Sequence, residues 1–389
     1  MLKYHLSYWE QETFFKDVDL VVIGAGIVGL NAAIHARVLA PRARVLVVER
    51  GPLPVGASTR NAGFACWGSL TELLDDMQRY GENSVFDLIA MRWDGLQRLR
   101  QRCGDEALRY EPLGGFEMFT DDDLDDYHNC VEAAPYFNDK LRVLTGQKDT
   151  YISADERIPA FGFAQVRHLI CNTGEGQLHT GAMMQRLLGL AREAGVEVLC
   201  GMPIAKIEQH SNGVELHTEY GWSIRAAKTL VAVNGFAADL LDSPAVAPAR
   251  NQVLITDPIP GLRIKGSFHY DRGYYYFRNI DGRILLGGGR NLDPEAERTA
   301  VFGANELIRS ALVHLLNSVI CPDRSASVAQ WWSGILGLGP EKKPVVQKIG
   351  PHLAVAVRLS GMGVAIGTLV GENGVALLFE EAVAPLANP

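Results

Sequence analysis

Hydrophobic and polar positions near the start of the chain follow the order strand, helix, strand. The apolar run at 20–23 (Leu-Val-Val-Ile) predicts a buried parallel strand, and helix signals follow at 27–39 until Pro41 ends them. A second apolar run at 45–48 predicts another buried strand that closes at Glu49. Together these segments predict one βαβ unit, whose crossover is expected to be right-handed.

The remaining pattern mixes helical and extended segments. Helices are predicted at 83–103, 180–194, 303–316 and about 364–380, with Gly195 as the cap of the second. Short strands are predicted at 115–119 (half-buried), 196–199, 204–208 and 228–233. Residues 249–290 are strand-rich and aromatic, and strands and turns return at 325–358. Parallel-strand signals thus bracket a region of antiparallel character, which predicts an α/β fold with a second, separate sheet.

Composition narrows the class of protein. The 389 residues are 47% hydrophobic and 21% charged, so the chain is globular and long enough for two domains. The formal net charge of -8 argues against a general nucleic-acid binder. The six cysteines form no Cys-x-x-Cys pair, the N-terminus has no apolar signal region, and no apolar run approaches membrane-spanning length. We therefore expect reduced thiols, no transmembrane segment and a cytosolic location.

An acidic run at 121–126 is the one feature that suggests a metal site. It holds five aspartates but lacks the spacing and the glycine of a calcium loop. Acidic side chains are favoured at the start of a helix, where they complement the helix dipole. We therefore predict a solvated helix start and no metal.

A dinucleotide fingerprint follows the first predicted strand. Gly24-Ala25-Gly26-Ile27-Val28-Gly29 has the form G-x-G-x-x-G, in which the glycines permit a tight turn, close approach of a diphosphate and close packing of helix on strand. Glu49 lies 20 residues beyond Gly29 and ends the next strand, where its carboxylate can accept hydrogen bonds from ribose hydroxyls. A carboxylate disfavours a 2′-phosphate, so NAD or FAD is expected rather than NADP.

The residues after Glu49 carry a resemblance to a known family. Arg50 is followed by Gly56-Ala57-Ser58-Thr59-Arg60-Asn61-Ala62-Gly63-Phe64, which resembles the second flavin-contacting segment of the D-amino-acid oxidase superfamily, with glycine, sarcosine and γ-glutamylputrescine oxidases among its members. We call residues 56–64 the flavin loop. Later segments are similar in order: the strand around Ile204, the turn at Asn234-Gly235, the aromatic strands at 274–288, and Gly361-Met362-Gly363-Val364.

The resemblance implies an FAD site built from these segments. It implies a discontinuous, Rossmann-like FAD-binding domain at 17–80, 165–245 and 335–389, interwoven with a mainly antiparallel substrate-binding domain at 81–164 and 246–334. The family attaches its flavin covalently through Cys or His. Since no Cys lies between Trp331 and Gly361 and Arg60-Asn61 stands in the flavin loop, noncovalent FAD is expected.

The implied chemistry is oxidation of the C–N bond of a small amine or amino acid. Hydride passes to flavin N5, the imine hydrolyses, and O2 or another acceptor reoxidises the flavin. A helix N-terminus after Gly363 is expected to stabilise charge at the flavin N1–C2=O edge. The family's carboxylate-binding Arg would fall near Leu336-Gly337 and its Lys at Ala365, so neither of these substrate contacts is expected.

Six further side chains are candidates for the substrate side, each with a structural alternative. Tyr275 is a candidate catalytic residue and, with Phe277 on the same face by the period of two, a candidate wall for the amine; core packing is the alternative. Arg283 is a candidate catalytic cation or a surface hairpin residue. Arg60, His269 and Trp332 are candidate substrate contacts; ion pairing, packing and burial are their alternatives.

Rival functions remain open at this stage. An FAD-dependent 2-hydroxy-acid dehydrogenase or oxidase would need a His base and a carboxylate clamp, neither of which is assigned. A flavin-bearing redox, interaction or RNA-modification protein is a third hypothesis, although the acidic charge counts against RNA. An NAD-dependent dehydrogenase leaves residues 57–64 and Gly361-x-Gly363 unexplained.

Overall fold

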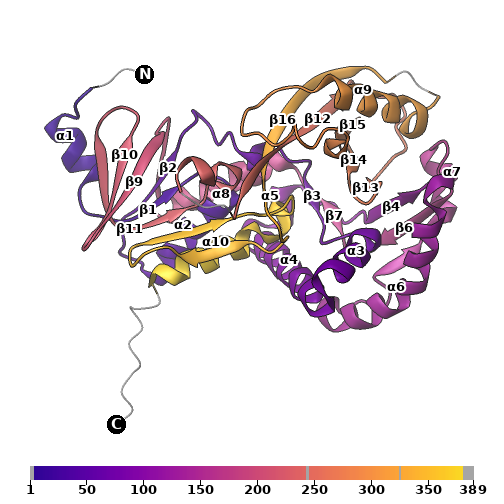
Figure 1. Cartoon of the computed structure of the whole chain (residues 1–389), viewed down its shortest axis with the longest axis horizontal. Coiled ribbons are helices and arrows are strands. Elements are labelled where there is room, and N and C mark those ends of the chain that lie inside the picture. Colours follow the sequence, from indigo (N-terminus) through magenta and orange to yellow (C-terminus); the bar gives the residue numbers. More distant parts are fainter. Residues whose placement is uncertain (1–3, 242–244, 324–325, 380–389) are drawn as a thin grey trace, which may run out of the picture.

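The computed structural model describes residues 4–241, 245–323 and 326–379, which build two large sheets side by side (Figure 1). The first, sheet A, has the order β17-β18-β11-β1-β2-β8, and β9 and β10 extend it as a hairpin. Its strands are β1 (Val18–Ile23), β2 (Val45–Glu49), β8 (Glu197–Cys200), β9 (Ile204–His210), β10 (Gly213–Thr218), β11 (Ser223–Val231), β17 (Val345–Lys348) and β18 (Leu353–Val357). The strands β18, β11, β1, β2 and β8 run parallel, as the sequence predicts.

Helices cover sheet A and bury its apolar strands. The covering helices include α2 (Ile27–Leu39), α4 (Glu82–Cys103), α8 (Thr180–Glu193) and α10 (Gly363–Phe379), which share one core with β1 and β2. Gly371 shows how closely α10 packs on α2, since a Cβ there would lie 2.4 Å from the Val28 carbonyl oxygen. The predicted helices at 83–103, 180–194 and 364–380 are confirmed to within a residue at each described end.

Sheet C is the second large sheet, with the order β16-β12-β15-β14-β13-β4-β6-β5. Its strands are β4 (Gly115–Phe119), β5 (Tyr151–Ser153), β6 (His168–Asn172), β12 (Ala247–Thr256), β13 (Ser267–Tyr270), β14 (Tyr275–Ile280), β15 (Arg283–Gly288) and β16 (Val328–Leu338). Only the β13–β4 pair is parallel, so the predicted antiparallel character is confirmed. β6 and the end of β16 belong to this sheet although they fall in ranges that the sequence assigned to the FAD-binding domain.

Sheet C has two chemically different faces. Its outer face, which carries Leu254, Phe277 and Leu286, packs against α9 (Glu306–Leu315). Its inner face, which carries Val253, Tyr276, Leu285 and Trp332, packs against Ala62 and Phe64 of the flavin loop. The two sheets are therefore joined through the flavin loop, which continues into β3 (Phe64–Ala65) and its partner β7 (Gly176–Gln177).

The shorter elements complete the chain. Helices α3 (Leu70–Tyr80) and α6 (Leu124–Thr145) pack near β4 and β5, and α1 (Tyr8–Glu10), α5 (Asp105–Leu108) and α7 (Ile158–Phe161) are single turns. Two π-helical segments follow α1 and α9, at Gln11–Phe15 and Leu316–Ile320. The 3-10 turns are Ala57–Thr59, Asp121–Asp123, Asp155–Arg157, Asn234–Asp239 and Arg290–Leu292. Within the described ranges, no helix has the length and apolar character needed to cross a bilayer.

Three local predictions differ from the structure. β4 is buried on both faces because Thr71 of α3 covers its Glu117 and the outer face stacks Phe116 on Phe268. α9 begins at Glu306 rather than 303, since the Asn305 side chain caps it by accepting from the Leu307 N–H at 3.1 Å. β9 continues past the predicted 208 to His210, and β11 begins at Ser223 rather than 228 and ends at Val231 rather than 233, because the hairpin with β10 lengthens both strands at that end.

Candidate functional site

A cavity of about 500 Å³ opens at the carboxyl ends of the parallel strands of sheet A. β1 and β2 reach it with Ile23 and Glu49, and the segment after β11 reaches it with Asn234. Ligands of open α/β sheets bind at this edge. The cavity contains these predicted cofactor residues: Gly24, Gly26, Ile27, Val28, Glu49, Arg50, Ala57, Ser58, Asn61, Ile204, Asn234, Gly361, Gly363 and Val364.

The three fingerprint glycines are required by close contacts. Gly24 has φ +106°, and a Cβ there would lie 2.7 Å from the Ala232 carbonyl oxygen. A Cβ on Gly26 would lie 2.8 Å from Ser58 Oγ, and one on Gly29 would lie 1.9 Å from the Gly24 carbonyl oxygen. Gly29 does not line the cavity, because its role is to let α2 approach β1.

The N-terminus of α2 points at the cavity. Its N-cap is Gly26, which has no side chain to accept a hydrogen bond from the first turn, while the Ile27 N–H donates to Ser58 Oγ at 2.9 Å. Free N–H groups and the positive end of the helix dipole suit a diphosphate. Ala25 does not line the cavity; its N–H donates to Glu49 Oε2 at 3.1 Å.

Glu49 is held rigidly at the end of β2. Its side chain is buried, with 7% of the residue exposed, and its other oxygen, Oε1, accepts from the Gly51 N–H at 3.1 Å. Next to it, the Arg50 guanidinium lies 3.6 Å above the centre of the Phe236 ring, which also lines the cavity. The pair places an acceptor and a cation side by side at one end of the site.

The flavin loop is organised by its own side chains. Asn61 Nδ2 donates to the Ala57 and Ser58 carbonyls, and Asn61 Oδ1 accepts from the Gly63 N–H at 2.8 Å. Arg60 points away from the cavity and donates to the Val55 and Ser333 carbonyls. Four predicted cofactor residues of the loop, Arg60, Ala62, Gly63 and Phe64, therefore lie outside the cavity lining.

The segment before α10 closes the other end of the cavity. Gly361 has φ +86° with open space where a Cβ would be, and Met362 is set back from the lining. Asn234 Oδ1 accepts from the Arg358 and Leu359 N–H groups at 3.1 and 3.2 Å, so it fixes this segment to the end of β11. Gly235 also lies outside the lining, since a Cβ there would lie 2.4 Å from the Leu336 carbonyl oxygen.

The two predicted substrate-side residues of β14 lie on the face of sheet C that points away from the flavin loop. Tyr275 and Phe277 share a face, as the period of two predicts, but it is the outer face. Phe277 is fully buried and stacks on Phe268 at 4.8 Å, which removes it from the cavity side. Tyr276, which lies between them in the sequence, faces inward: its ring meets Phe64 edge-on and its hydroxyl accepts from Asn251 Nδ2 at 3.1 Å.

The predicted catalytic Arg283 lies beside the turn of its hairpin. It pairs with Ile280 beside the turn and donates to the Thr256 carbonyl at 2.7 Å, outside the cavity lining. The neighbouring buried cation is Arg278, which donates to the Gly63 and Leu178 carbonyls at 3.1 and 2.6 Å. Burial lowers the pKa of the Arg278 guanidinium to about 10. No sequence motif indicated that Arg278 would hold the flavin loop.

His269 and Trp332 both reach the flavin loop from the inner face. The His269 ring meets Phe64 edge-on at 5.2 Å, and burial lowers its pKa. Its Nε2 has no hydrogen-bond partner within the described part of the chain. Trp332 Nε1 donates to the Arg60 carbonyl at 3.0 Å. Neither side chain belongs to the cavity lining, and their contact with a substrate stays a prediction.

Glu175 was not anticipated from the sequence. Its carboxyl group accepts from the Trp67 and Gly68 N–H groups at 2.7 and 3.1 Å, and burial raises its pKa to about 8. One ligand atom each of Glu175, Cys66 and His269 lie within 4.8 Å of one another. Burial also raises the pKa of the Cys66 thiol, which disfavours the nucleophilic thiolate form.

Comparisons with known proteins agree with this geometry. The family described as DAO, FAD dependent oxidoreductase, matches residues 19–377. The probable oxidoreductase OrdL of Rhizobium meliloti is 26% identical over 379 residues, covering 92% of this chain and 82% of the relative. N-methyl-L-tryptophan oxidase of Yersinia pestis is 24% identical over 393 residues, covering 94% and 95%.

Solved structures share the fold. L-proline dehydrogenase from P. horikoshii has a TM-score of 0.73 at 18% identity and covers 95% of both chains. Glycine oxidase from Bacillus cereus has a TM-score of 0.72 at 15% identity, covering 94% of this chain and 98% of its own. The predicted fold class and family resemblance are thereby confirmed. Since the family match spans nearly all of sheets A and C together with the cavity, the chain belongs to the DAO family of FAD-dependent oxidoreductases.

Proposed function

We propose that the chain binds FAD noncovalently in the sheet A cavity and oxidises the C–N bond of a small amine or amino acid. The observation that carries the cofactor assignment is the cradle at the start of α2. At the three glycines there, neighbouring atoms leave no room for a Cβ. The helix N-terminus faces the cavity, and the Glu49 carboxylate lies at the end of β2. The names of relatives, N-methyl-L-tryptophan oxidase and glycine oxidase, support the reaction class.

Each part of the cavity suits one part of FAD. The first turn of α2 and Ser58 suit the diphosphate, Glu49 suits the adenosine ribose, and Ile204 offers an apolar contact for adenine. Gly361 and Gly363 leave backbone free at the start of α10, where a helix N-terminus can meet a developing negative charge. When bound, FAD supplies the hydride acceptor.

The inner face of sheet C supplies the substrate side. Tyr276, Trp332 and Phe64 form an aromatic surface beside the flavin loop that excludes water and attracts a cationic amine by about 0.5–2 kcal/mol. His269 is favoured in its neutral form by burial, and its Nε2 is free of hydrogen bonds among the described residues. It is therefore suited to hold a proton released by the amine. Arg278 fixes Gly63, so the loop stays in place during the reaction.

The first experiment tests the cofactor. Purified protein should be yellow, and acid precipitation should release the flavin into the supernatant as FAD. A flavin that stays with the precipitate would contradict noncovalent binding, and a colourless protein that takes up no FAD would contradict the cofactor assignment.

The second experiment tests the substrate class by anaerobic bleaching of the flavin. Polyamines, N-methyl amino acids, D-amino acids and 2-hydroxy acids are mixed separately with the protein without oxygen. We expect bleaching by at least one amine. Bleaching by hydroxy acids alone would replace the amine with a 2-hydroxy acid as the substrate. Readmitting air then separates an oxidase, which regains its colour quickly, from a dehydrogenase.

A further inference from the structure

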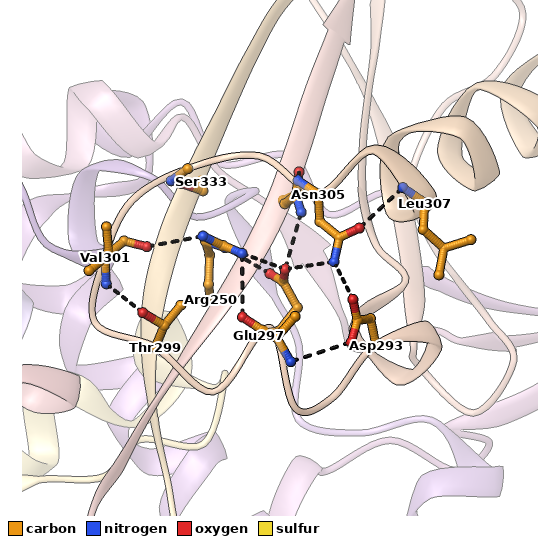
Figure 2. Close-up of polar contacts among 11 residues, drawn as sticks. Arg250, Asp293, Glu297, Thr299, Val301, Asn305, Leu307 and Ser333 are labelled. Carbon is orange, nitrogen blue, oxygen red and sulfur yellow. Dashed lines mark hydrogen bonds and ion pairs between the residues drawn. The ribbon is translucent and has the colours of Figure 1, made fainter.

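A loop on the outer side of sheet C reaches around edge strand β16 to the cofactor cavity. We call residues 293–305, between the turn Arg290–Leu292 and α9, the clamp loop. Its anchor is Glu297, which is 0% exposed and lies opposite Arg250 of β12 (Figure 2). Glu297 Oε2 accepts from Arg250 Nε at 3.0 Å, and Glu297 Oε1 accepts from Arg250 Nη2 at 2.8 Å, so the two side chains form a bidentate ion pair.

Further hydrogen bonds fix both ends of the clamp loop. Asn305 Nδ2 donates to Glu297 Oε1 at 3.2 Å and to Asp293 Oδ2 at 2.8 Å. The Gly303 N–H donates to Ser333 Oγ on β16 at 3.1 Å. The Arg250 N–H also donates to the Glu297 carbonyl at 2.8 Å, so main chain and side chain are both held. The shape of the loop is therefore set by groups that no part of the cofactor cavity supplies.

Phe302 of this loop contacts the flavin loop and one residue of the cavity wall. The Arg60 guanidinium, from the flavin loop, lies 4.4 Å above the centre of the Phe302 ring. Phe302 also packs against Phe236 at 6.2 Å, and Arg50 covers Phe236 at 3.6 Å. Phe236 and Arg50 line the cavity. Phe302 thus lies between the flavin loop and the wall that carries Phe236.

We propose that Phe302 and Glu297 are positioning residues that close the FAD site. Phe302 holds Arg60 of the flavin loop and Phe236 of the cavity wall in place, and the buried Glu297–Arg250 pair holds the loop that carries Phe302. Arg60 is the suitable contact because its own backbone is fixed to β16 by Trp332 Nε1. A loop on the outer side of sheet C therefore controls how tightly the sheet A cavity retains its cofactor. The inference rests on the proposed noncovalent binding of FAD.

The decisive experiment measures the FAD dissociation constant of reconstituted apoprotein by quenching of FAD fluorescence. Phe302→Ala should weaken FAD binding about five- to tenfold, as expected for loss of one cation–π contact and its packing. Phe302→Tyr keeps the ring and should bind FAD within about twofold of the wild type. Because Phe302 is only partly buried, the thermal midpoint of the apoprotein should stay unchanged in both variants.

A second pair of variants tests the anchor. Glu297→Gln keeps the shape of the side chain but removes the charge opposite Arg250, so it should weaken FAD binding at least as much as Phe302→Ala. Glu306→Gln is the matched control, since its carboxylate pairs with Arg309 at the start of α9 and is 81% exposed. Glu306→Gln should leave FAD binding unchanged. Should Glu297→Gln fail to fold, the two Phe302 variants still decide the matter.

The possible results separate the two proposals. If the wild type binds FAD reversibly and Phe302→Ala binds it equally well, the proposed positioning role of Phe302 is wrong and the proposed function stands. If Phe302→Ala weakens FAD binding only in proportion to a lowered thermal midpoint of the apoprotein, Phe302 has a structural role alone, and the proposed positioning role is again wrong. A wild-type apoprotein that binds no FAD overturns both proposals.

Discussion

Single side chains at the cavity combine a structural and a binding role. Glu49 accepts from the Ala25 and Gly51 N–H groups, and it stands where the fingerprint expects a ribose contact. These two hydrogen bonds fix the carboxylate before the cofactor arrives, so little rotamer freedom remains to be lost on binding. Asn61 does the same for the flavin loop by bonding three backbone groups of its own segment.

Replacement of Glu49 tests this double role. Glu49→Ala should weaken FAD binding about 10- to 100-fold, because hydrogen bonds to a charged acceptor contribute about 1.5–3 kcal/mol. The measurement is equilibrium binding of FAD to apoprotein, with the exposed Glu193→Ala on α8 as control. Unchanged cofactor occupancy in Glu49→Ala would count against a ribose contact.

The two neighbouring tyrosines of β14 test which face meets the substrate. Tyr276 lies on the inner face and Tyr275 on the outer, so they form a matched pair. Tyr276→Phe removes the hydroxyl that accepts from Asn251 and should lower kcat/KM for the bleaching amine about tenfold, the cost of one hydrogen bond in the site. Tyr275→Phe should stay near the wild-type value. A larger effect at Tyr275 would restore the interpretation from the sequence.

At the scale of elements, α2 and its Gly-rich start decide the nucleotide site. The helix begins directly at the cavity because Gly24 turns the chain and Gly29 lets the helix lie against β1. α10 has the same arrangement at the other end of the cavity. It begins at Gly363, and its Gly371 packs on Val28 of α2. Two helix N-termini consequently face one cavity.

A pair of glycine substitutions separates close packing from mere flexibility. Gly29→Ala should destabilise the apoprotein by about 2–4 kcal/mol, since its Cβ would lie 1.9 Å from the Gly24 carbonyl oxygen and overpacking of this kind is costly. Gly56→Ala is the control, because nothing lies within 4 Å of its Cβ and its φ of -75° suits alanine. Chemical denaturation of both apoproteins is the measurement. Equal stability would refute the close-packing role of Gly29.

At the scale of the whole molecule, the flavin loop is the junction between the two sheets. Sheet C holds it from one side through Trp332 and Arg278, and sheet A holds it through the contact of Ser58 with α2. Glu175 secures the chain just beyond the loop, at Trp67 and Gly68. The stability of this junction should therefore depend on the protonation state of Glu175.

The free energy of unfolding should consequently fall with rising pH. Burial raises the pKa of Glu175 from 4.5 to about 8 in the folded protein, so the folded form binds an additional proton between these values. Its stabilising effect is complete below pH 4.5 and is lost as the pH rises towards 8. Between pH 6 and 8 the loss should be about 2 kcal/mol. Denaturation at several pH values measures it, and Glu175→Gln, which keeps an acceptor for both N–H groups, should flatten the slope. An equal slope in both proteins would assign the effect to other groups.

Local sequence determined the nucleotide-binding half. The close approach of Gly29 to the Gly24 carbonyl and the hydrogen bond from the Ala25 N–H to Glu49 lie within one βαβ unit, so spacing along the chain was enough to predict them. Hydrophobic period likewise predicted the helices of sheet A and the shared face of Tyr275 and Phe277.

Only the tertiary structure decided which face of sheet C meets the flavin loop. A period of two assigns residues to a common face but does not say which face α9 covers, and α9 buries the side that carries Phe277. The pairing of Arg250 with Glu297, of Glu175 with Trp67, and of Phe302 with Arg60 likewise joins segments far apart in sequence. Such contacts depend on how complete elements pack together, and no short stretch of residues contains that information.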